Sequence, residues 1–325
     1  MAIEPTEELF DLLNRGVARE LQVAVQYMLQ HFKMEKILRR VKLENIILDK
    51  TTYDAIGELL RKIAIEEMKH AAHIMERIYY LNGEATTKSA KPMIGETMKD
   101  FMANGLHAEE EALDLYRKTL QLTESMGDYT TNELFRDIYE DEEKHYFAFQ
   151  EHLNIDDAEP EGPPHEETEN PKIFTPEYFE LLNKAVAAEI SAIVQYTNQH
   201  EKAAKIALRE MVVPLETIKD KTKAGEVSEI LKKIFMQEMN HLEKIGERIY
   251  KVKGECVYNP DPLPEVGDNA DDFLRLDHKA EDYAIVLYRQ IIAEAITRGD
   301  TKTRKIFEDI VVEEEEHYWT FDDFF

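Results

Sequence analysis

The chain carries the same sequence pattern twice. Residues 6–37 read TEELFDLLNRGVARELQVAVQYMLQHFKMEKI, residues 175–206 read TPEYFELLNKAVAAEISAIVQYTNQHEKAAKI, and about half of the aligned positions are identical. Later segments match too: the run IAIEEMKHAAHIMERIYYLNGE from Ile63 aligns with IFMQEMNHLEKIGERIYKVKGE from Ile234, and RDIYEDEEKHY aligns with EDIVVEEEEHY near the end of each half. Self-similarity over such a length indicates that one domain has been duplicated.

The segment between the two halves, residues 154–174, differs from both in composition. It contains four prolines among a cluster of acidic residues. Prolines lack the amide donor that a helix needs, and like charges repel one another and extend the chain. We therefore predict an acidic, proline-rich linker here, with one domain over residues 1–153 and a second over residues 175–325.

The apolar residues of each half recur with a helical period. The pairs Asn82-Gly83 and Lys253-Gly254 are typical of helix ends. The path from His70 to Glu109 is too long for a tight hairpin, which indicates a crossover along the bundle. The predicted fold class is all-α, with two tandem four-helix bundles that have long crossover connections. The expected helices are residues 6–38, 53–82, 93–125 and 129–152, then 175–209, 224–253, 266–298 and 300–321.

Composition and charge limit the possible functions. The net charge of −27 argues against nucleic acid and anionic membranes as partners, because both are themselves negatively charged. Cys256 is the only cysteine, which excludes an internal disulfide, a zinc ribbon and a four-cysteine iron site. No apolar run is long enough for a membrane span and no signal region opens the chain. We expect a soluble, cytoplasmic protein.

Paired carboxylates and histidines are the residues most suggestive of chemistry. Glu-x-x-His places both side chains on one helical face, where they can reach the same metal ion. Each half has two such pairs, and a lone glutamate on both its first and its third helix. The resulting set of four glutamates and two histidines is that of a dinuclear carboxylate site. The predicted ligands are Glu20, Glu67, His70, Glu109, Glu142 and His145, then Glu189, Glu238, His241, Glu281, Glu314 and His317.

The spacing supports this assignment because the offset between equivalent ligands is almost constant. It is 169 residues for the first-helix glutamates, 171 for the second-helix pairs, and 172 for the third and fourth helices. Four buried carboxylates would be costly alone, whereas two divalent cations neutralise them. Oxygen-rich ligation with one imidazole per metal suits iron or manganese. Two zinc ions would offer no redox chemistry.

Two further sets of residues lie near the predicted ligands. A tyrosine follows each lone glutamate by two helical turns, where its phenol can hydrogen-bond a ligand carboxylate from another helix. A polar residue precedes each paired glutamate and lies four residues before the histidine of the same helix, which it can orient. Solvent-facing acids are the alternative for this second set. The tyrosines are Tyr27, Tyr116, Tyr196 and Tyr288, and the polar residues are Glu66, Asp141, Gln237 and Glu313.

These residues resemble the ferritin-like superfamily, and bacterioferritin in particular. The runs EMKHAAHIMERIYYLNG from Glu67, IGETMKDFMANGLHAEEEALDLY from Ile94 and RDIYEDEEKH from Arg136 follow its order and spacing. The likeness covers nearly all of both halves. It implies that the twelve residues ligate two pairs of irons, with ferrous iron and either dioxygen or peroxide as partners. The implied activity is that of a ferroxidase, with a role in iron homeostasis.

The sequence departs from the bacterioferritin pattern in ways that keep alternatives open. Bacterioferritins end in a short fifth helix that helps to build a 24-subunit shell, whereas the second half here stops at Phe325. A monomer or small homo-oligomer is therefore expected rather than a cage. Rubrerythrin adds a glutamate at the positions of Ala112 and Ala284 and usually a cysteine-rich iron domain, so it matches less well. A peroxide-reducing di-metal enzyme, like rubrerythrin or manganese catalase, and a non-catalytic iron-binding protein remain the alternatives.

The resemblance also raises the question of haem. Bacterioferritin binds haem between two subunits through a methionine just after the second-helix glutamate, and Met68 and Met239 occupy that position. The resemblance implies one haem shared by the two halves between these methionines. A packing role in the protein core is commoner for methionine, so haem is the less favoured of the two interpretations.

Overall fold

The computed structural model describes residues 4–38, 46–153, 173–210 and 222–325. These residues form helices and connections without a strand, as the all-α prediction required. The chain divides into two compact units, residues 1–165 and 166–325. The predicted linker lies almost wholly outside the described residues. None of the described helices is long and apolar enough to cross a membrane.

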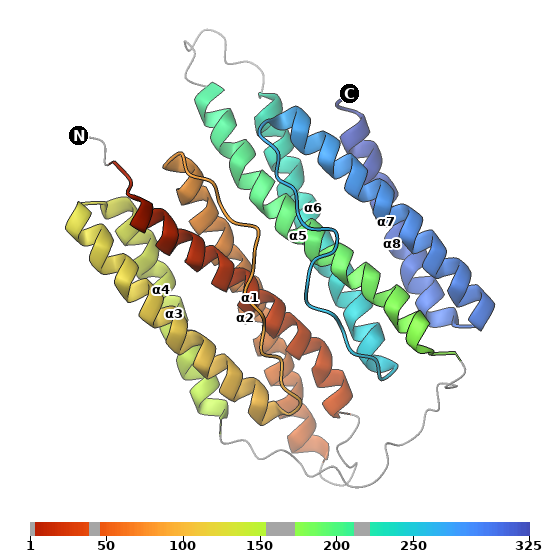
Figure 1. Ribbon diagram of the computed structural model, residues 1–325. Coiled ribbons are helices and arrows are strands. Elements are labelled where there is room, and N and C mark those ends of the chain that lie inside the picture. Colours follow the sequence, from red (N-terminus) through yellow and green to blue (C-terminus); the bar gives the residue numbers. More distant parts are fainter. Residues whose placement is uncertain (1–3, 39–45, 154–172, 211–221) are drawn as a thin grey trace. The chain divides into compact units, whose positions relative to one another are not determined.

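Each unit is a four-helix bundle made of two packed helix pairs (Figure 1). In the first unit α1 packs on α2 and α3 on α4; in the second, α5 packs on α6 and α7 on α8. An extended connection runs along the bundle from the second helix to the third in each unit, which is the predicted crossover. The helices are α1 (Glu7–Leu38), α2 (Ile46–Tyr80), α3 (Met98–Met126), α4 (Tyr129–His152), α5 (Pro176–Glu210), α6 (Lys223–Lys251), α7 (Ala270–Arg298) and α8 (Thr301–Asp322).

Buried glutamines hold the crossover connections in place. In the first unit the Met93 amide donates to Gln26 Oε1 at 2.8 Å, and Gln30 Nε2 donates to the Ile94 carbonyl at 2.9 Å. Because an extended segment has no helical partners for its backbone, these side chains replace the missing hydrogen bonds. The second unit repeats the arrangement with Gln195 accepting from the Glu265 amide and Gln199 donating to the Glu265 carbonyl.

Three helix starts differ from the predicted ones. Helices α3 and α7 begin at Met98 and Ala270 rather than at residues 93 and 266. Their N-caps explain the delay, since Thr97 accepts from the Asp100 amide and Asn269 from the Asp272 amide. These bonds satisfy donors that the first helical turn leaves free. Helix α2 begins at Ile46 instead of residue 53, because no proline or glycine interrupts the run before Gly57.

A buried ion pair ties the second helix to the turn between the third and fourth. In the first unit Arg77 donates from Nη2 to Asp128 at 2.8 Å and from Nε to Thr131 at 2.7 Å. Asp128 is also the N-cap of α4, so one carboxylate caps a helix and fixes its neighbour. The second unit repeats this arrangement with Arg248, Asp300 and Thr303.

Candidate metal centres

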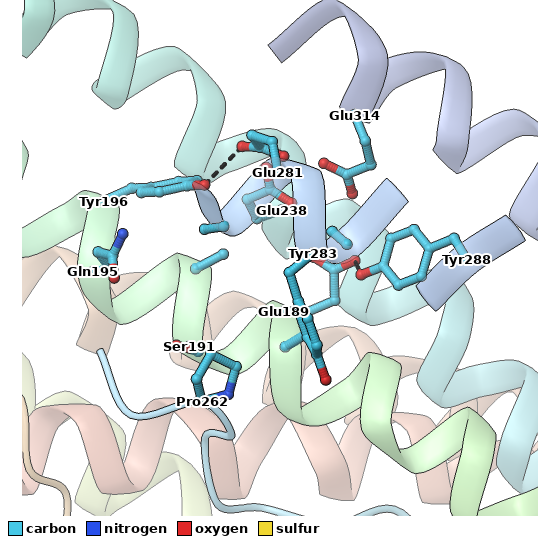
Figure 2. A pocket seen from close by; sticks show the side chains of 14 residues that line it. Glu189, Ser191, Gln195, Tyr196, Glu238, Pro262, Glu281, Tyr283, Tyr288 and Glu314 are labelled. Atoms are coloured by element: carbon cyan, nitrogen blue, oxygen red, sulfur yellow. Dashed lines mark hydrogen bonds between the residues drawn. The ribbon is translucent and has the colours of Figure 1, made fainter. Parts of the chain in front are cut away.

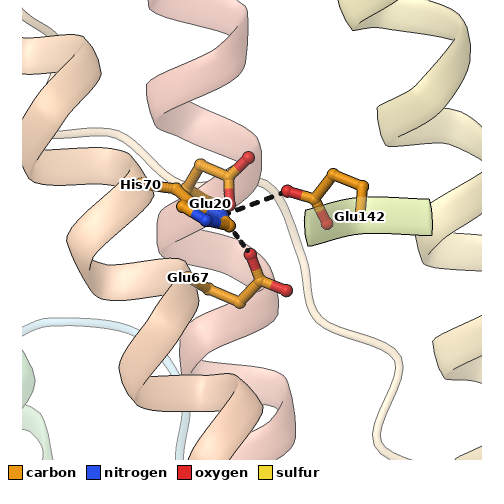
Figure 3. Close-up of side chains that lie close together, drawn as sticks. All are labelled: Glu20, Glu67, His70 and Glu142. Atoms are coloured by element: carbon orange, nitrogen blue, oxygen red, sulfur yellow. Dashed lines mark hydrogen bonds and ion pairs between the residues drawn. The ribbon is translucent and has the colours of Figure 1, made fainter. Parts of the chain in front are cut away.

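The six predicted ligands of each unit meet inside its bundle. In the first unit α1 contributes Glu20, α2 the Glu67/His70 pair, α3 Glu109 and α4 the Glu142/His145 pair, and all six residues are at most 5% exposed. Figure 3 shows four of them converging from α1, α2 and α4. Each Glu-x-x-His pair directs both side chains inward because residues three apart share a helical face.

The distances in the first unit divide its carboxylates into two kinds. Glu67 lies 3.1 Å from His70 Nδ1 and 3.0 Å from His145 Nδ1. Glu142 likewise lies 3.2 Å from His70 Nδ1 and 3.3 Å from His145 Nδ1. Both carboxylates therefore lie between the two imidazoles. Glu20 groups only with His70, and Glu109 only with His145.

The second unit has the same geometry. Glu238 lies 3.1 Å from His241 Nδ1 and 3.0 Å from His317 Nδ1. Glu314 lies 3.0 Å and 3.2 Å from the same two atoms. Glu189 groups with His241 and Glu281 with His317. The duplication has thus preserved two central and two outer carboxylates in each centre.

Burial and charge make these clusters strong proton binders. Burial, followed by repulsion from Glu142 and Glu67, raises the pKa of Glu20 well above its ordinary value. Burial alone would lower the pKa of His145, but the charge of Glu67 and hydrogen bonds to the carboxylates outweigh it and raise this pKa to about 12. The same balance raises the pKa of His241 to about 12 and that of His317 to about 9. Cations other than protons would relieve the same accumulation of negative charge.

The clusters fit metal ions as well as protons. Four groups of three glutamates and one histidine, two in each unit, have their ligand atoms within 4.8 Å of one another. A metal with bonds of about 2.0–2.2 Å holds opposite ligands roughly 4 Å apart, which is close to the spread of the ligand atoms in each group. Both carboxylate oxygens of Glu20, and Oε2 of Glu189, are buried without a hydrogen-bond donor in the described part of the chain. These free acceptors are suited to cation binding.

Comparison with known proteins assigns the chain to a family. The profile of the ferritin-like domain matches the chain twice, over residues 10–158 and 179–325. The chain belongs to the ferritin-like domain family. This finding confirms the resemblance drawn from the sequence, and the two matches correspond to the two repeats.

Several bacterioferritins are similar to one copy of the domain. That of Desulfovibrio desulfuricans is 31% identical over 139 residues, which are 42% of this chain and 70% of that protein. That of Mycolicibacterium paratuberculosis is 30% identical over 151 residues, or 46% of this chain and 86% of that protein. That of Brucella melitensis is 26% identical over 149 residues, with 46% and 84% covered. Each alignment spans less than half of this ferritin-like chain, as expected for a tandem duplication.

Three of the four predicted tyrosines bond to carboxylates of these ferritin-like centres. Tyr27 donates to Glu109, Tyr288 donates to Glu189, and Tyr196 donates to Glu281 at 2.7 Å. Tyr116 is the exception, because its buried hydroxyl has no hydrogen-bond partner in the described part of the chain. The tyrosines therefore orient the outer carboxylates, and Glu20 is the one outer carboxylate without such support.

Three of the four polar residues before the paired glutamates contact a histidine of the opposite helix, not of their own. Glu66 on α2 lies 3.1 Å from Nε2 of His145 on α4, and Asp141 on α4 lies 3.6 Å from Nε2 of His70. In the second unit Glu313 lies 3.2 Å from His241 Nε2. The predicted pairing within one helix is therefore wrong for these three acids, and for Gln237 it stays a prediction. Residues four apart point to the same face, but the outer nitrogen of each ring faces the neighbouring helix.

Other sequence predictions concern residues near the centres. Met68 and Met239 are both buried, with 6% exposure. Haem binding through them stays a prediction, and a Soret band from protein expressed with ample haem would support it. Sequence reasoning missed Asp277, a fully buried acid that accepts from Gln195 at 2.8 Å. It also missed Arg19, which is buried beside the first-helix ligand. A comparison of the repeats position by position reveals both, because the corresponding residues are Gly105 and Ala188.

Proposed function

We propose that each unit binds a pair of iron ions and oxidises ferrous iron with dioxygen or peroxide. The observation that carries this proposal is the cluster of four glutamates and two histidines, buried in the middle of each bundle and repeated with the same geometry. The similarity to bacterioferritins supports iron as the metal. Two ferrous ions supply one electron each, so that dioxygen with two protons becomes hydrogen peroxide, or peroxide with two protons becomes two waters.

The distances suggest a role for each ligand. Glu67 and Glu142 lie between both histidines of the first unit and are suited to bridge two ions, as Glu238 and Glu314 are in the second. The outer glutamates each belong to one group and are suited to bind one ion. Carboxylates held between both histidines would set the separation of two bound ions, which is the contribution expected of the protein in a two-metal site.

Hydrogen bonds around the ligands keep their geometry fixed. Tyr27 holds Glu109, and Glu66 holds the outer nitrogen of His145, so that Nδ1 faces the cluster. Partners of this kind orient a ligand and increase its basicity. The surrounding bundle buries every ligand of both centres and so separates them from bulk water, which protects the reaction from side products.

Iron titration under anaerobic conditions, followed by oxygen, tests this function. We expect the near-ultraviolet absorbance that forms on oxygenation to saturate at about two ferrous ions per unit. The double variant Glu67→Ala/Glu238→Ala removes one bridging carboxylate from each centre and should abolish the signal. Glu110→Ala and Asp282→Ala are matched controls, since both side chains are exposed and each directly follows an outer ligand.

The same experiment separates this function from its rivals. Unchanged oxidation in the Glu67→Ala/Glu238→Ala variant would show that the centres lie elsewhere. Manganese in the native protein together with sustained peroxide turnover would indicate a peroxide-reducing enzyme instead. Iron binding that oxygen leaves unoxidised would indicate a binding protein without ferroxidase activity.

A further inference from the structure

The second centre has an opening beside it. A cavity of about 40 Å³ lies against the carboxylates of Glu189, Glu238, Glu281 and Glu314. A single water needs roughly 10–15 Å³ of such space, so the cavity is large enough for water-sized molecules. Figure 2 shows these carboxylates on one side of the cavity, with Pro262 of the crossover connection lying away from them.

This cavity adjoins a larger hollow. A second pocket, of about 520 Å³, shares Gln195, Pro262, Ala280 and Tyr283 with the first. Its remaining lining includes Leu263 and Val286, which are 76% and 61% exposed. The smaller cavity therefore lies against the carboxylate cluster, and the larger one lies against the same four shared residues and includes exposed side chains.

The lining of the smaller cavity includes three small residues of α5. Ala188, Ser191 and Ala192 all line the cavity. The equivalent positions on α1 are Arg19, Gln22 and Val23. These three larger side chains are all buried in the first unit, with Arg19 only 8% exposed.

An ion pair joins two of the equivalent positions in the first unit. Arg19 Nη1 donates to Glu111 at 3.0 Å, which links α1 to α3. The counterparts of these residues are Ala188 and Tyr283, both of which line the cavity of the second unit. In the first unit, the Arg19 side chain therefore extends from the position that corresponds to Ala188 at the cavity of the second unit. Its positive charge also acts on Tyr27 of the same centre, where it opposes the rise of the tyrosine's pKa, and it repels a cation that approaches from this side.

We propose that the two centres take up metal at different rates, with Arg19 as the residue that closes the first centre and the Ala188 cavity as the access route to the second. The proposal rests on the metal binding put forward above. Ferrous ions, and small oxidants such as dioxygen, reach the second cluster through the opening lined by Pro262 and Tyr283. The first cluster exchanges its ions more slowly because Arg19 and Glu111 must separate first.

Cobalt(II) alone is a suitable probe, because its binding produces visible absorption and needs no oxidation. Single-centre proteins isolate each rate: Glu238→Ala/Glu314→Ala leaves the first centre intact, and Glu67→Ala/Glu142→Ala leaves the second intact. Stopped-flow mixing with Co²⁺ should show the second centre filling about tenfold faster or more, the range over which cleft charge changes association rates.

Reciprocal substitutions test the role of Arg19 itself. Arg19→Ala should speed filling of the first centre by about tenfold, and Ala188→Arg/Tyr283→Glu should slow filling of the second by a similar factor. Arg15→Ala, also on α1 but with a side chain that is 54% exposed, is the control and should change neither rate. Thermal melting establishes that each variant is folded. Arg19→Ala removes one ion pair of Glu111, whose side chain is 55% exposed and also lies 3.7 Å from His107 Nε2.

Equal filling rates for the two centres would overturn the proposal, as would an Arg19→Ala variant whose first centre fills no faster. These results differ from a failure of the proposed function. If neither centre bound Co²⁺, the ligand assignment itself would be wrong. If Co²⁺ bound with the expected rates but ferrous iron were not oxidised, the access route would stand and the ferroxidase activity would not.

Discussion

Glu66 and Gln237 occupy the same position in the two repeats, and only one of them is charged. Glu66 lies 3.1 Å from His145 Nε2. The equivalent atom of the second unit, His317 Nε2, is buried and has no hydrogen-bond partner in the described residues. Because a carboxylate on the outer nitrogen fixes the ring and increases its basicity, we predict that Glu66→Gln weakens metal binding and Gln237→Glu strengthens it.

The size of the effect follows from the surroundings of Glu66. Loss of an outer partner typically costs about 10–100-fold in metal affinity, or about 1.4–2.7 kcal/mol. The Glu66 side chain is 35% exposed, and solvent weakens its charge. We therefore expect the lower end of this range, about tenfold in each direction.

Competition titration with a chromophoric chelator measures these affinities. Each substitution is placed in the protein that retains only its own centre, so that one set of sites is observed. Glu76→Gln, an exposed acid on the same helix as Glu66, should leave the affinity unchanged. Equal affinities for Glu66→Gln and the unsubstituted protein would refute the idea that the outer carboxylate tunes the histidine.

Three other predictions concern stability and protons. Arg248→Met leaves the buried carboxylate of Asp300 without its cation, so it should lower the free energy of unfolding, measured in urea, by about 3–5 kcal/mol. Arg289→Met, in an exposed pair, should lower it by only about 0–1 kcal/mol, and equal losses for the two variants would contradict this. Burial raises the pKa of Asp277 well above its ordinary value. The protonated carboxyl therefore contributes its full share to the free energy of unfolding below the ordinary pKa, and this contribution is lost as the pH rises through the raised pKa. In metal-free protein, Asp277→Asn should therefore raise the melting temperature at neutral pH, and this gain should vanish near about pH 4, while the exposed Asp282→Asn should show no such trend. Finally, the pKa of His241 is raised to about 12, so metal binding should release protons and weaken as the pH falls. Calorimetry in buffers of different ionisation enthalpy measures this release, and an observed heat that is the same in every buffer would count against it.

The fold could be predicted from the sequence because the patterns that indicate it lie within single helices and occur in both repeats. The Glu67/His70 spacing needs only helical geometry to place both side chains on one face. The same pattern recurs at Glu238/His241, which makes chance an inadequate explanation. The helix ends at Asn82 and Lys253 could also be predicted from the sequence, and both residues adopt positive φ, at 66° and 69°.

Contacts between helices were harder to predict. Glu66 is four residues before His70, yet it bonds to His145 on α4. That choice depends on the packing of α2 against α4 and on which ring nitrogen faces the cluster. Neither follows from periodicity along a single helix, which specifies a face but not the partner across it.

Differences between the repeats were visible in the sequence but had no meaning without the structure. The exchange of Arg19 for Ala188 looks like one surface variation among many, because arginine is mostly exposed in proteins. Its burial depends on how α1 faces α3, where Glu111 provides the partner. Gly105 and Asp277 form a similar case, since a side chain at Gly105 would collide with Phe149.

Anomalous diffraction above and below the iron edge, from crystals loaded with iron without oxygen, tests the central claim most directly. The account predicts a pair of iron peaks in each unit, each peak within bonding distance of Nδ1 of His70, His145, His241 or His317. Iron bound away from these four nitrogens, or a unit whose carboxylate cluster stays without metal when iron is in excess, would contradict it.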